Sequence, residues 1–278
     1  ATLAKNIGST RSTGFEIGLK GVIMEKKNFD WTAYLNMSHN HSYWVERNPE
    51  VDIAPWIKEK DDLSPIYGWK TNGIFQSLEE VQQYTSNGKV LQPDSYAGNK
   101  KFVDINGDGV LNDDDIVKLG NNEPKMHFGL GTSFRIKNVM VDLDTYGVLG
   151  RKTYDQWIHR GLCDNTSYRY KEVWTSFNTS GWWPGIAPNA AANSNKSGTD
   201  DFSLQNTHYW RFKNIKVTYL LPKDWMKKSK IASNASVYLD LQNTLLLTNY
   251  EGLDPEMEQN ASPLPIPFTV VLGVDITF

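Results

Sequence analysis

The chain ends in a stretch, Phe268 to Phe278, that places a large apolar side chain at every second position. Successive side chains of a β-strand point to opposite faces, so one face of this strand is apolar throughout. Strands of about nine to eleven residues with one apolar face and a terminal aromatic ring are typical of transmembrane β-barrels. The pattern therefore predicts a membrane-crossing strand, and the core strand of a water-soluble β-sandwich is the alternative.

Earlier segments repeat this alternation. No apolar run reaches the roughly 18 residues that a membrane helix needs, so any crossing of a bilayer must be made by strands. We predict an all-β chain with an antiparallel sheet, in which the terminal strand is the seventh. The other six segments are Arg11–Met24, Asp30–Trp44, Met126–Ile136, Val139–Asp144, Tyr209–Leu221 and Ser236–Leu247.

The connections between these segments alternate strictly between short and long. The short ones are Glu25–Phe29, Lys137–Asn138 and Pro222–Ser233, and the long ones cover about 47–125, 150–208 and 248–267. In an antiparallel sheet, this order puts all short turns at one end and all long loops at the other. Outer-membrane barrels have such an asymmetry, with short periplasmic turns and long extracellular loops. Because bacterial barrels have even strand counts of at least eight, seven strands would form part of a larger sheet.

The net charge and the cysteine count argue against two classes of protein, nucleic-acid-binding proteins and disulfide-stabilised domains. The net charge of −3 and the isoelectric point near 6.0 argue against a nucleic-acid partner held by phosphate contacts. The single cysteine, Cys163, excludes an internal disulfide. The opening Ala-Thr-Leu-Ala-Lys does not read as a signal peptide, so we expect that a leader was removed or that the start of the protein is missing.

The first long loop contains a twelve-residue stretch, Asp104 to Asp115, with the spacing of a calcium-binding loop. Oxygen ligands recur at positions one, three, five, seven, nine and twelve of such loops, and a glycine at position six permits the sharp turn, here Gly109. The final residue is usually a glutamate, so the shorter Asp115 leaves the denticity open. An acidic, solvated turn is the alternative, and a bound ion would first serve to order the loop. The predicted ligands are Asp104, Asn106, Asp108, Val110 through its carbonyl, Asn112 through water, and Asp115.

Other parts of the loops carry local signals. Ser77-Leu-Glu-Glu80 predicts a capping box that opens a short helix, with Gly88 as its stop. Four prolines predict an irregular path elsewhere in this loop: Pro49, Pro55, Pro65 and Pro93. In the second loop, three tryptophans could stack on sugar rings or on peptide side chains, although packing of the loop is the favoured interpretation. They are Trp174, Trp182 and Trp183.

Several stretches together resemble the C-terminal barrel portion of the SusC-like (SusC/RagA) TonB-dependent outer-membrane transporters of Bacteroidetes. They follow the family's order along nearly the whole chain. They are Ser12-Thr-Gly-Phe-Glu-Ile, Gly73-Ile-Phe-Gln, the calcium-like Asp104 to Asp115 followed by Gly120, Tyr209-Trp-Arg-Phe-Lys-Asn-Ile, Tyr219-Leu-Leu-Pro222, Gln242-Asn243, Tyr250-Glu-Gly-Leu-Asp-Pro255 and the closing Phe278.

This resemblance implies that residues 1–278 form about the last seven strands of a 22-stranded barrel in the bacterial outer membrane. It also implies import of glycans or peptides, driven by the TonB complex, with a SusD-like lipoprotein as a lid. The plug domain and the TonB-contacting segment belong to the N-terminal part of such proteins, and we expect neither in this chain. Its partners would then be the remainder of the barrel with its plug, the lid, outer-membrane lipids and, through the N-terminal part, TonB.

The alternative to this transporter fragment is a soluble extracellular carbohydrate-binding module, a calcium-stabilised β-sandwich. No pair of carboxylates can be assigned acid and base roles, so we predict that the chain is not an enzyme. The substrate stays open, because the polar residues expected on the lumen face select neither a glycan nor a peptide. These are Glu16, Lys20, Arg135, Asp142, Asp144, Asp240 and Asp275.

Overall fold

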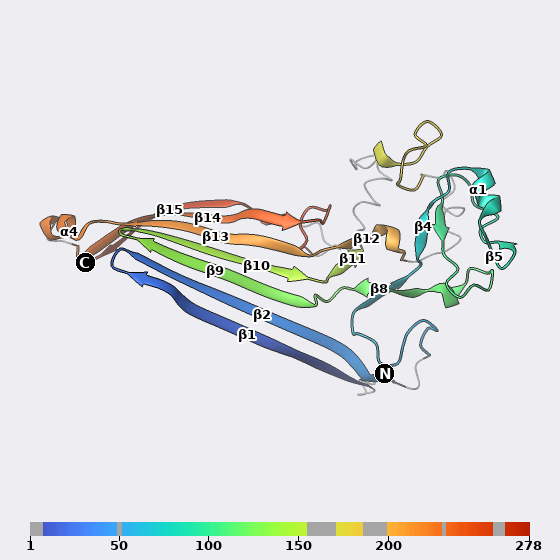
Figure 1. Ribbon diagram of the computed structural model, residues 1–278, viewed down its shortest axis with the longest axis horizontal. Coiled ribbons are helices and arrows are strands. Elements are labelled where there is room, and N and C mark those ends of the chain that lie inside the picture. Colours follow the sequence, from blue (N-terminus) through green and yellow to red (C-terminus); the bar gives the residue numbers. More distant parts are fainter. Residues whose placement is uncertain (1–7, 49–51, 155–170, 186–198, 230–231, 258–264) are drawn as a thin grey trace, which may run out of the picture.

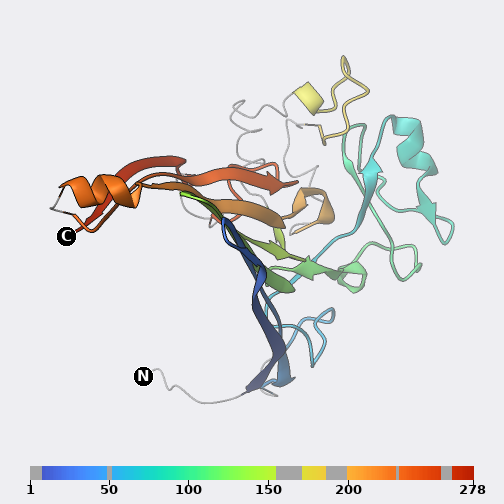
Figure 2. The same cartoon turned by 60° about the vertical axis from the view of Figure 1, so that its left-hand side comes forward.

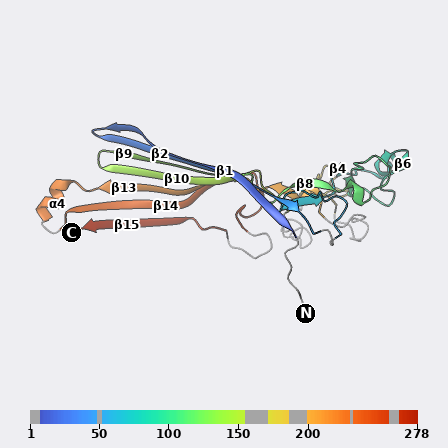
Figure 3. The ribbon, with the colours of Figure 1, turned by 90° about the horizontal axis from the view of Figure 1, so that it is seen from below.

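A computed structural model describes residues 8–48, 52–154, 171–185, 199–229, 232–257 and 265–278. Its main feature is one antiparallel seven-stranded sheet in which neighbours in space follow the order of the chain. Figures 1 and 3 show the sheet as a single layer, and Figure 2 shows its curvature. The strands are β1 (Ser9–Lys26), β2 (Phe29–Glu46), β9 (Met126–Ile136), β10 (Val139–Leu149), β13 (Tyr209–Leu220), β14 (Asn234–Thr248) and β15 (Thr269–Thr277).

The short and the long connections lie at opposite ends of the sheet, as the sequence predicts. Two-residue turns, Lys27–Asn28 and Lys137–Asn138, join β1 to β2 and β9 to β10, and Lys137 adopts a positive φ of 53° there. The β13–β14 connection carries the helix α4 (Lys223–Ser229). All three lie at one end of the sheet, and the long loops lie at the other (Figure 1). Several strands run a few residues beyond their predicted ends, because backbone pairing continues where the apolar alternation has stopped.

Strand register makes the two faces of the sheet chemically different. One row crosses all seven strands and contains apolar side chains alone, and we call this side the apolar face. It consists of Met24, Trp31, Phe134, Val141, Val217, Leu239 and Leu272. The adjacent row belongs to the opposite side, the polar face, and consists of Val22, Thr32, Ser133, Asp142, Lys216, Asp240 and Val271.

The apolar face is uncovered. Val270, Leu272 and Val274 of β15 are 55%, 75% and 59% exposed. A sandwich would bury these side chains against a second sheet, and no second layer covers them in the part of the chain that the structure describes. The β-sandwich alternative therefore does not describe this fold. No helix among the described residues is long and apolar enough to cross a membrane.

A buried core exists in the loops instead. Phe75 and Val81 are fully buried, and Trp69 packs edge-on against Phe102 with ring centroids 5.9 Å apart. The elements of the first long loop are β3 (Pro65–Gly68), β4 (Thr71–Ile74), α1 (Leu78–Gln83), β5 (Thr85–Ser86), β6 (Lys89–Val90), β7 (Lys100–Phe102), a 3-10 helix (Asp113–Asp115) and β8 (Val117–Asn121). The second long loop adds β11 (Lys152–Tyr154), a 3-10 helix (Asp201–Ser203) and β12 (Leu204–Asn206).

Three details of the first loop correct the sequence predictions. Ser77 caps α1 by accepting from Glu80 N, but the Glu80 carboxylate accepts from Gln76 N, so the capping box is not reciprocal. The helix ends at Gln83, and Gly88 at φ 75° instead belongs to the turn between β5 and β6. The loop is also less irregular than its prolines suggest, because Pro65 itself begins β3, which pairs with β8.

The two longest loops are joined into one layer, which we call the loop layer. Trp69 N donates to Thr199 O (2.9 Å), and Asp201 N donates back to Trp69 O (3.1 Å). The Lys100 ammonium and the Asp200 carboxylate form an ion pair of 2.5 Å. Because these contacts link residues 100 to 132 positions apart in the chain, each loop supports the other over one end of the sheet.

Candidate functional site

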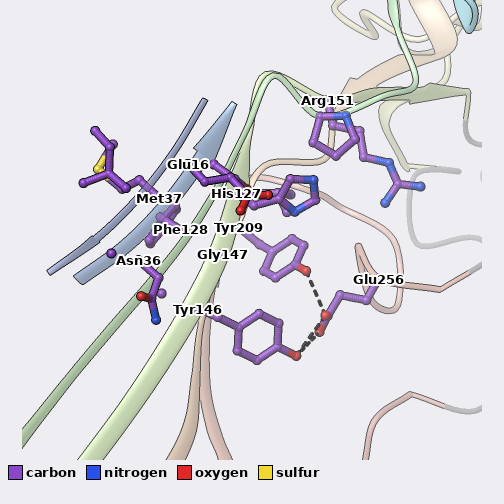
Figure 4. Close-up of a pocket in the computed structure, with 16 residues that line it drawn as sticks. Glu16, Asn36, Met37, His127, Phe128, Tyr146, Gly147, Arg151, Tyr209 and Glu256 are labelled. Atoms are coloured by element: carbon purple, nitrogen blue, oxygen red, sulfur yellow. Dashed lines mark hydrogen bonds between the residues drawn. The ribbon is translucent and has the colours of Figure 1, made fainter. Parts of the chain in front are cut away.

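The candidate site is a cavity on the polar face, where the sheet meets the loop layer (Figure 4). Its volume is about 680 Å³. Strands β1, β2, β9, β10 and β13 form its wall, and segments of the loops close its rim. Its polar lining includes Glu16, Ser38, His127, Tyr146, Tyr209 and Glu256, and Arg151 lies at its edge.

A buried charge cluster fixes the rim of this cavity. Arg211 Nη2 lies 2.7 Å from each carboxylate oxygen of Asp254, and Arg211 Nε lies 2.5 Å from Glu256 Oε2. The side chains of Arg211 and Asp254 are only 4% and 3% exposed. This ion pair joins charged groups, whose hydrogen bonds are roughly twice as strong as neutral ones, and both contacts come from the single nitrogen Nη2. It holds the Tyr250–Met257 segment against strand β13.

Two tyrosines complete the cluster. The hydroxyl of Tyr146 donates to both oxygens of Glu256 at 2.9 Å, and that of Tyr209 donates to Oε1 at 2.8 Å. Their strands place them on the polar face, with the rings edge to face at 6.0 Å. Glu256 is thus saturated with donors and acts as an anchor of the rim rather than as a free base. Arg211 and Asp254 both lie in stretches that carry the family resemblance, but no pattern in the sequence predicts that they pair.

A second, smaller cavity of about 350 Å³ lies further from the loops on the same face. Tyr34 OH donates to Asp144 Oδ1 at 2.8 Å, and Ser133 Oγ donates to Asp142 Oδ1 at 2.5 Å. Lys20 and Lys216 line the cavity as well, and the Lys216 ammonium lies 4.1 Å from the centre of the Tyr238 ring. The face carries charges of both signs in alternation. The register puts all seven polar residues predicted for the lumen on this face.

The predicted calcium loop is tightly wound. Asp104 accepts from Gly107 N (2.7 Å) and Gly109 N (2.8 Å), and fully buried Asp115 accepts from Ile105 N (2.8 Å) and Asn112 N (3.0 Å). Hydrogen bonds, with Ser86 as the largest cause, hold the pKa of Asp104 below its usual value.

The donor set of this loop is all oxygen, which suits calcium. Within the described ranges, no three His, Cys, Asp or Glu groups converge as a metal site by themselves. Asn106 and the Val110 carbonyl would therefore have to contribute, and calcium binding stays a prediction.

The three tryptophans lie in one part of the loop layer. Trp183 is 5% exposed and contacts Phe202, and Trp174 Nε1 donates to Gln76 Oε1 at 2.9 Å. Trp182 is half exposed, and its ring is stacked on that of Phe202. These contacts fit a packing role, while substrate contact by Trp182 stays a prediction.

Comparison with known proteins gives a consistent result. No protein-family model matches the chain. A TonB-dependent receptor of Formosa agariphila is 25% identical over 99% of the chain, and the TonB-dependent receptor SusC of Bacteroides thetaiotaomicron is 24% identical over 100%. The chain resembles the SusC-like TonB-dependent receptors over its whole length. It covers only 30% and 27% of the length of these two relatives.

Solved structures show the same fold. The RagAB peptide transporter superposes with a TM-score of 0.75 over 99% of this chain, at 22% identity and over 30% of that chain. The RagAB peptide importer in its 'closed-closed' state gives 0.72, also over 99% of this chain, at 22% identity and over 30% of that chain. The long antiparallel sheet with one-sided loops is thus an arrangement found in solved SusC-like transporters, and the predicted resemblance is confirmed.

Proposed function

We propose that this chain forms part of the wall and outer rim of a TonB-dependent nutrient importer in the bacterial outer membrane. The observation that carries the proposal is the apolar face, which spans all seven strands and is covered by no second layer among the described residues. An apolar face of this kind requires lipid, and a polar opposite face suits a watery lumen. Residues 1–278 would form one part of the barrel, as the family resemblance implies. The edge strands β1 and β15 would then pair with strands of the remainder of the barrel.

This proposal fixes an orientation, with the long loops outside the cell and the short turns in the periplasm. Cysteine labelling in intact cells tests it. In a full-length Cys163→Ser background, a maleimide on a polymer too large for outer-membrane pores should label Phe177→Cys, since Phe177 is fully exposed in the loop layer. Lys27→Cys in the β1–β2 turn should react only after the membrane is permeabilised.

Leu272→Cys on the apolar face is the matched control for burial in lipid. It should resist the reagent in both preparations and react once the protein is unfolded. Equal labelling of Phe177→Cys and Lys27→Cys in intact cells would contradict the proposed orientation. Labelling of Leu272→Cys in intact membranes would contradict the lipid-facing assignment.

The importer would act with the TonB complex and with a SusD-like lipoprotein over the extracellular mouth, and it would carry glycans or peptides. The alternating charges of the polar face and the cavity at the rim are compatible with either class. Growth of a deletion strain on panels of peptides and of glycans tests the proposal. We expect one panel to fail, and we expect rescue by the full-length protein only when the TonB complex is intact. Unchanged growth on every panel would contradict import.

We further propose that the Asp104–Asp115 loop binds calcium and that the ion serves to order the loop layer. Calorimetry with the full-length protein should show calcium binding that is lost in Asp104→Ala plus Asp108→Ala. The matched control is Asp113→Ala plus Asp114→Ala, which alters acidic residues outside the predicted ligand set and should retain the heat. Equal heats of calcium binding in all three proteins would contradict a calcium site in this loop.

A further inference from the structure

Two tyrosines of the polar face each lie over a glycine of the neighbouring strand. Tyr34 of β2 is directly opposite Gly131 of β9, and Tyr238 of β14 is directly opposite Gly273 of β15. A Cβ added to Gly131 would lie 2.1 Å from Tyr34 Cε1, and one added to Gly273 would lie 2.3 Å from Tyr238 Cζ. A glycine within a strand often marks such a close approach by another group. Each ring therefore occupies the space that a larger side chain would need.

The first of these pairs spans three strands. The Tyr34 hydroxyl continues past Gly131 and donates to Asp144 Oδ1 at 2.8 Å. Asp144 belongs to β10 and is the residue directly opposite Gly131 on that side. Tyr34 thus connects β2 to β10 over β9, and the glycine on the middle strand lies between the tyrosine and its acceptor.

The second pair has the same geometry at the edge of the sheet. Strands β2 and β14 run in the same direction, because four antiparallel pairings separate them, and both rings lean towards the later strand of the sheet order. For Tyr238 that later strand is β15, which lies at the edge (Figure 3). In the part of the chain that the structure describes, no group accepts a hydrogen bond from the Tyr238 hydroxyl. The position that Asp144 fills for Tyr34 would lie beyond the open edge of β15.

The charge beside Tyr238 favours an anionic acceptor there. The Lys216 ammonium lies over the Tyr238 ring, 4.1 Å from the ring centre, and a cation at this distance is attracted to the ring face. The positive charge also strengthens the hydroxyl as a hydrogen-bond donor. A carboxylate that accepts from this hydroxyl would make a charge-assisted hydrogen bond and would be attracted to the nearby ammonium.

We propose that Tyr238 reaches across β15 and donates to an acidic side chain on the strand that pairs with the open edge of β15. The acceptor lies directly opposite Gly273, as Asp144 lies opposite Gly131. This inference rests on the proposed function, since that strand belongs to the remainder of the barrel. It assigns Tyr238 to the contact between this chain and that remainder. A segment inside the lumen that contacts Tyr238 is the competing occupant.

Photo-crosslinking in the full-length protein tests which segment Tyr238 faces. Tyr238→p-benzoylphenylalanine places a reactive group at the tip of the ring, and mass spectrometry of the digested product identifies the peptide that it reaches. We expect a peptide from a barrel strand outside residues 1–278, with an aspartate or glutamate at the position opposite Gly273. Tyr34→p-benzoylphenylalanine is the matched control and should reach the β10 peptide that contains Asp144.

The crosslinked partner separates the two proposals. A product confined to β13–β15, or one with a lumen segment, would overturn the Tyr238 contact and leave the transporter proposal standing. A product that joins two copies of the protein would contradict both, because the β15 edge would then pair between molecules. Failure of the Tyr34 probe to reach β10 would contradict the register on which the Tyr238 contact depends.

The hydroxyl and the glycine have their own readouts. Tyr238→Phe should unfold in denaturant about fivefold faster than the parent, the effect of losing one hydrogen bond, and Tyr34→Phe should do the same. Tyr219→Phe, on the apolar face, is the control and should leave the rate unchanged. An unchanged rate in Tyr238→Phe would overturn the hydrogen bond. Gly273→Ala should displace the ring and abolish the crosslink from position 238, and a crosslink that persists would overturn the path over Gly273.

Discussion

The sheet and the loop layer differ in where their apolar side chains lie. The sheet leaves large side chains such as Leu272 and Val274 exposed, whereas the loop layer fully buries Phe75 and Val81. A sheet in a bilayer needs only backbone pairing and an apolar outer face, because lipid covers that face. Loops in water have no such cover and need a core of their own. If the sheet lies in the outer membrane as proposed, lipid is the solvent that accounts for its exposed apolar surface.

The largest expected effect on stability comes from the buried charge cluster around Arg211, where the sheet meets the loops. Arg211→Leu should destabilise the full-length protein by about 5 kcal/mol, the upper end for breaking a buried ion pair, because the Asp254 carboxylate would stay buried without its cationic partner. Denaturant unfolding in detergent micelles measures this change. Arg135→Leu, which breaks the 42% exposed pair with Asp30 on the same face, should cost about 0–1 kcal/mol. Similar losses of unfolding free energy in both variants would mean that the buried cluster around Arg211 stabilises the protein no more than an exposed ion pair does.

The core of the loop layer should be nearly as sensitive. Phe75→Ala is expected to cost about 3–5 kcal/mol of local stability, because a fully buried ring leaves a cavity. Hydrogen exchange of the loop amides, with the sheet amides as an internal reference, is the measurement. Phe177→Ala, at a fully exposed ring in the same layer, should change stability by less than about 0.5 kcal/mol. Faster exchange throughout the sheet would show that the two regions unfold together.

The sheet should respond to lipid exposure rather than to packing. If the apolar face lies in lipid as proposed, Leu272→Arg should destabilise the full-length protein in vesicles by about 2–4 kcal/mol, the cost of a cation near the bilayer midplane. The adjacent Val271→Arg places the cation on the polar face, in the row of Asp240, and should cost less than about 1 kcal/mol. If Val271→Arg is the more harmful of the two, the faces are assigned the wrong way round.

A smaller effect tests local structure within the loop layer. Ser77→Ala removes the cap that Glu80 N uses and should cost about 0.5–2 kcal/mol, because that N–H loses its acceptor. Protease cleavage within α1, measured against the full-length parent, reports this change. Ser176→Ala, at an exposed position of the second loop, serves as the control. No difference between the two variants would show that the cap does not limit the local stability.

The smallest expected effect is a pH dependence of the loop layer. Burial alone would raise the pKa of Asp61, but hydrogen bonds from Lys118 and Tyr67 lower it to about 2. A depressed carboxyl pKa gives stability that is present above the unfolded value of 3.8 and lost as the pH falls towards 2. The protection factors of the β3–β8 amides in hydrogen exchange should therefore fall across that window, and Asp61→Asn should remove the change. A fall of equal size in the variant would assign it to other groups.

The sequence predicted the sheet well, for a local reason. Alternation along each strand is set by neighbouring side chains, so the two faces and the sorted turns could be read directly. Strand ends were less certain, because polar residues such as Ser9 continue to pair after the alternation stops. Gly88 was assigned to a helix stop although it forms a turn with Asn87, since both roles use a positive φ.

The candidate site was less predictable. The pair of Arg211 and Asp254 and the anchoring of Glu256 by Tyr146 and Tyr209 depend on which strands and loops become neighbours, and no local pattern records that. The joining of the two longest loops through Trp69 and Thr199 depends on the same long-range arrangement. The sequence shows which residue types are present, but it does not show which of them contact one another in the fold.

Strands with one apolar face and long loops at one end could be predicted from the sequence alone, because these properties repeat every second residue or follow from segment lengths. The single layer of the sheet, the buried core in the loops and the anchoring of the rim by Arg211 became visible only in the folded chain. Those features arise from contacts between distant residues, whose free energy depends on the assembled neighbours and not on any one segment.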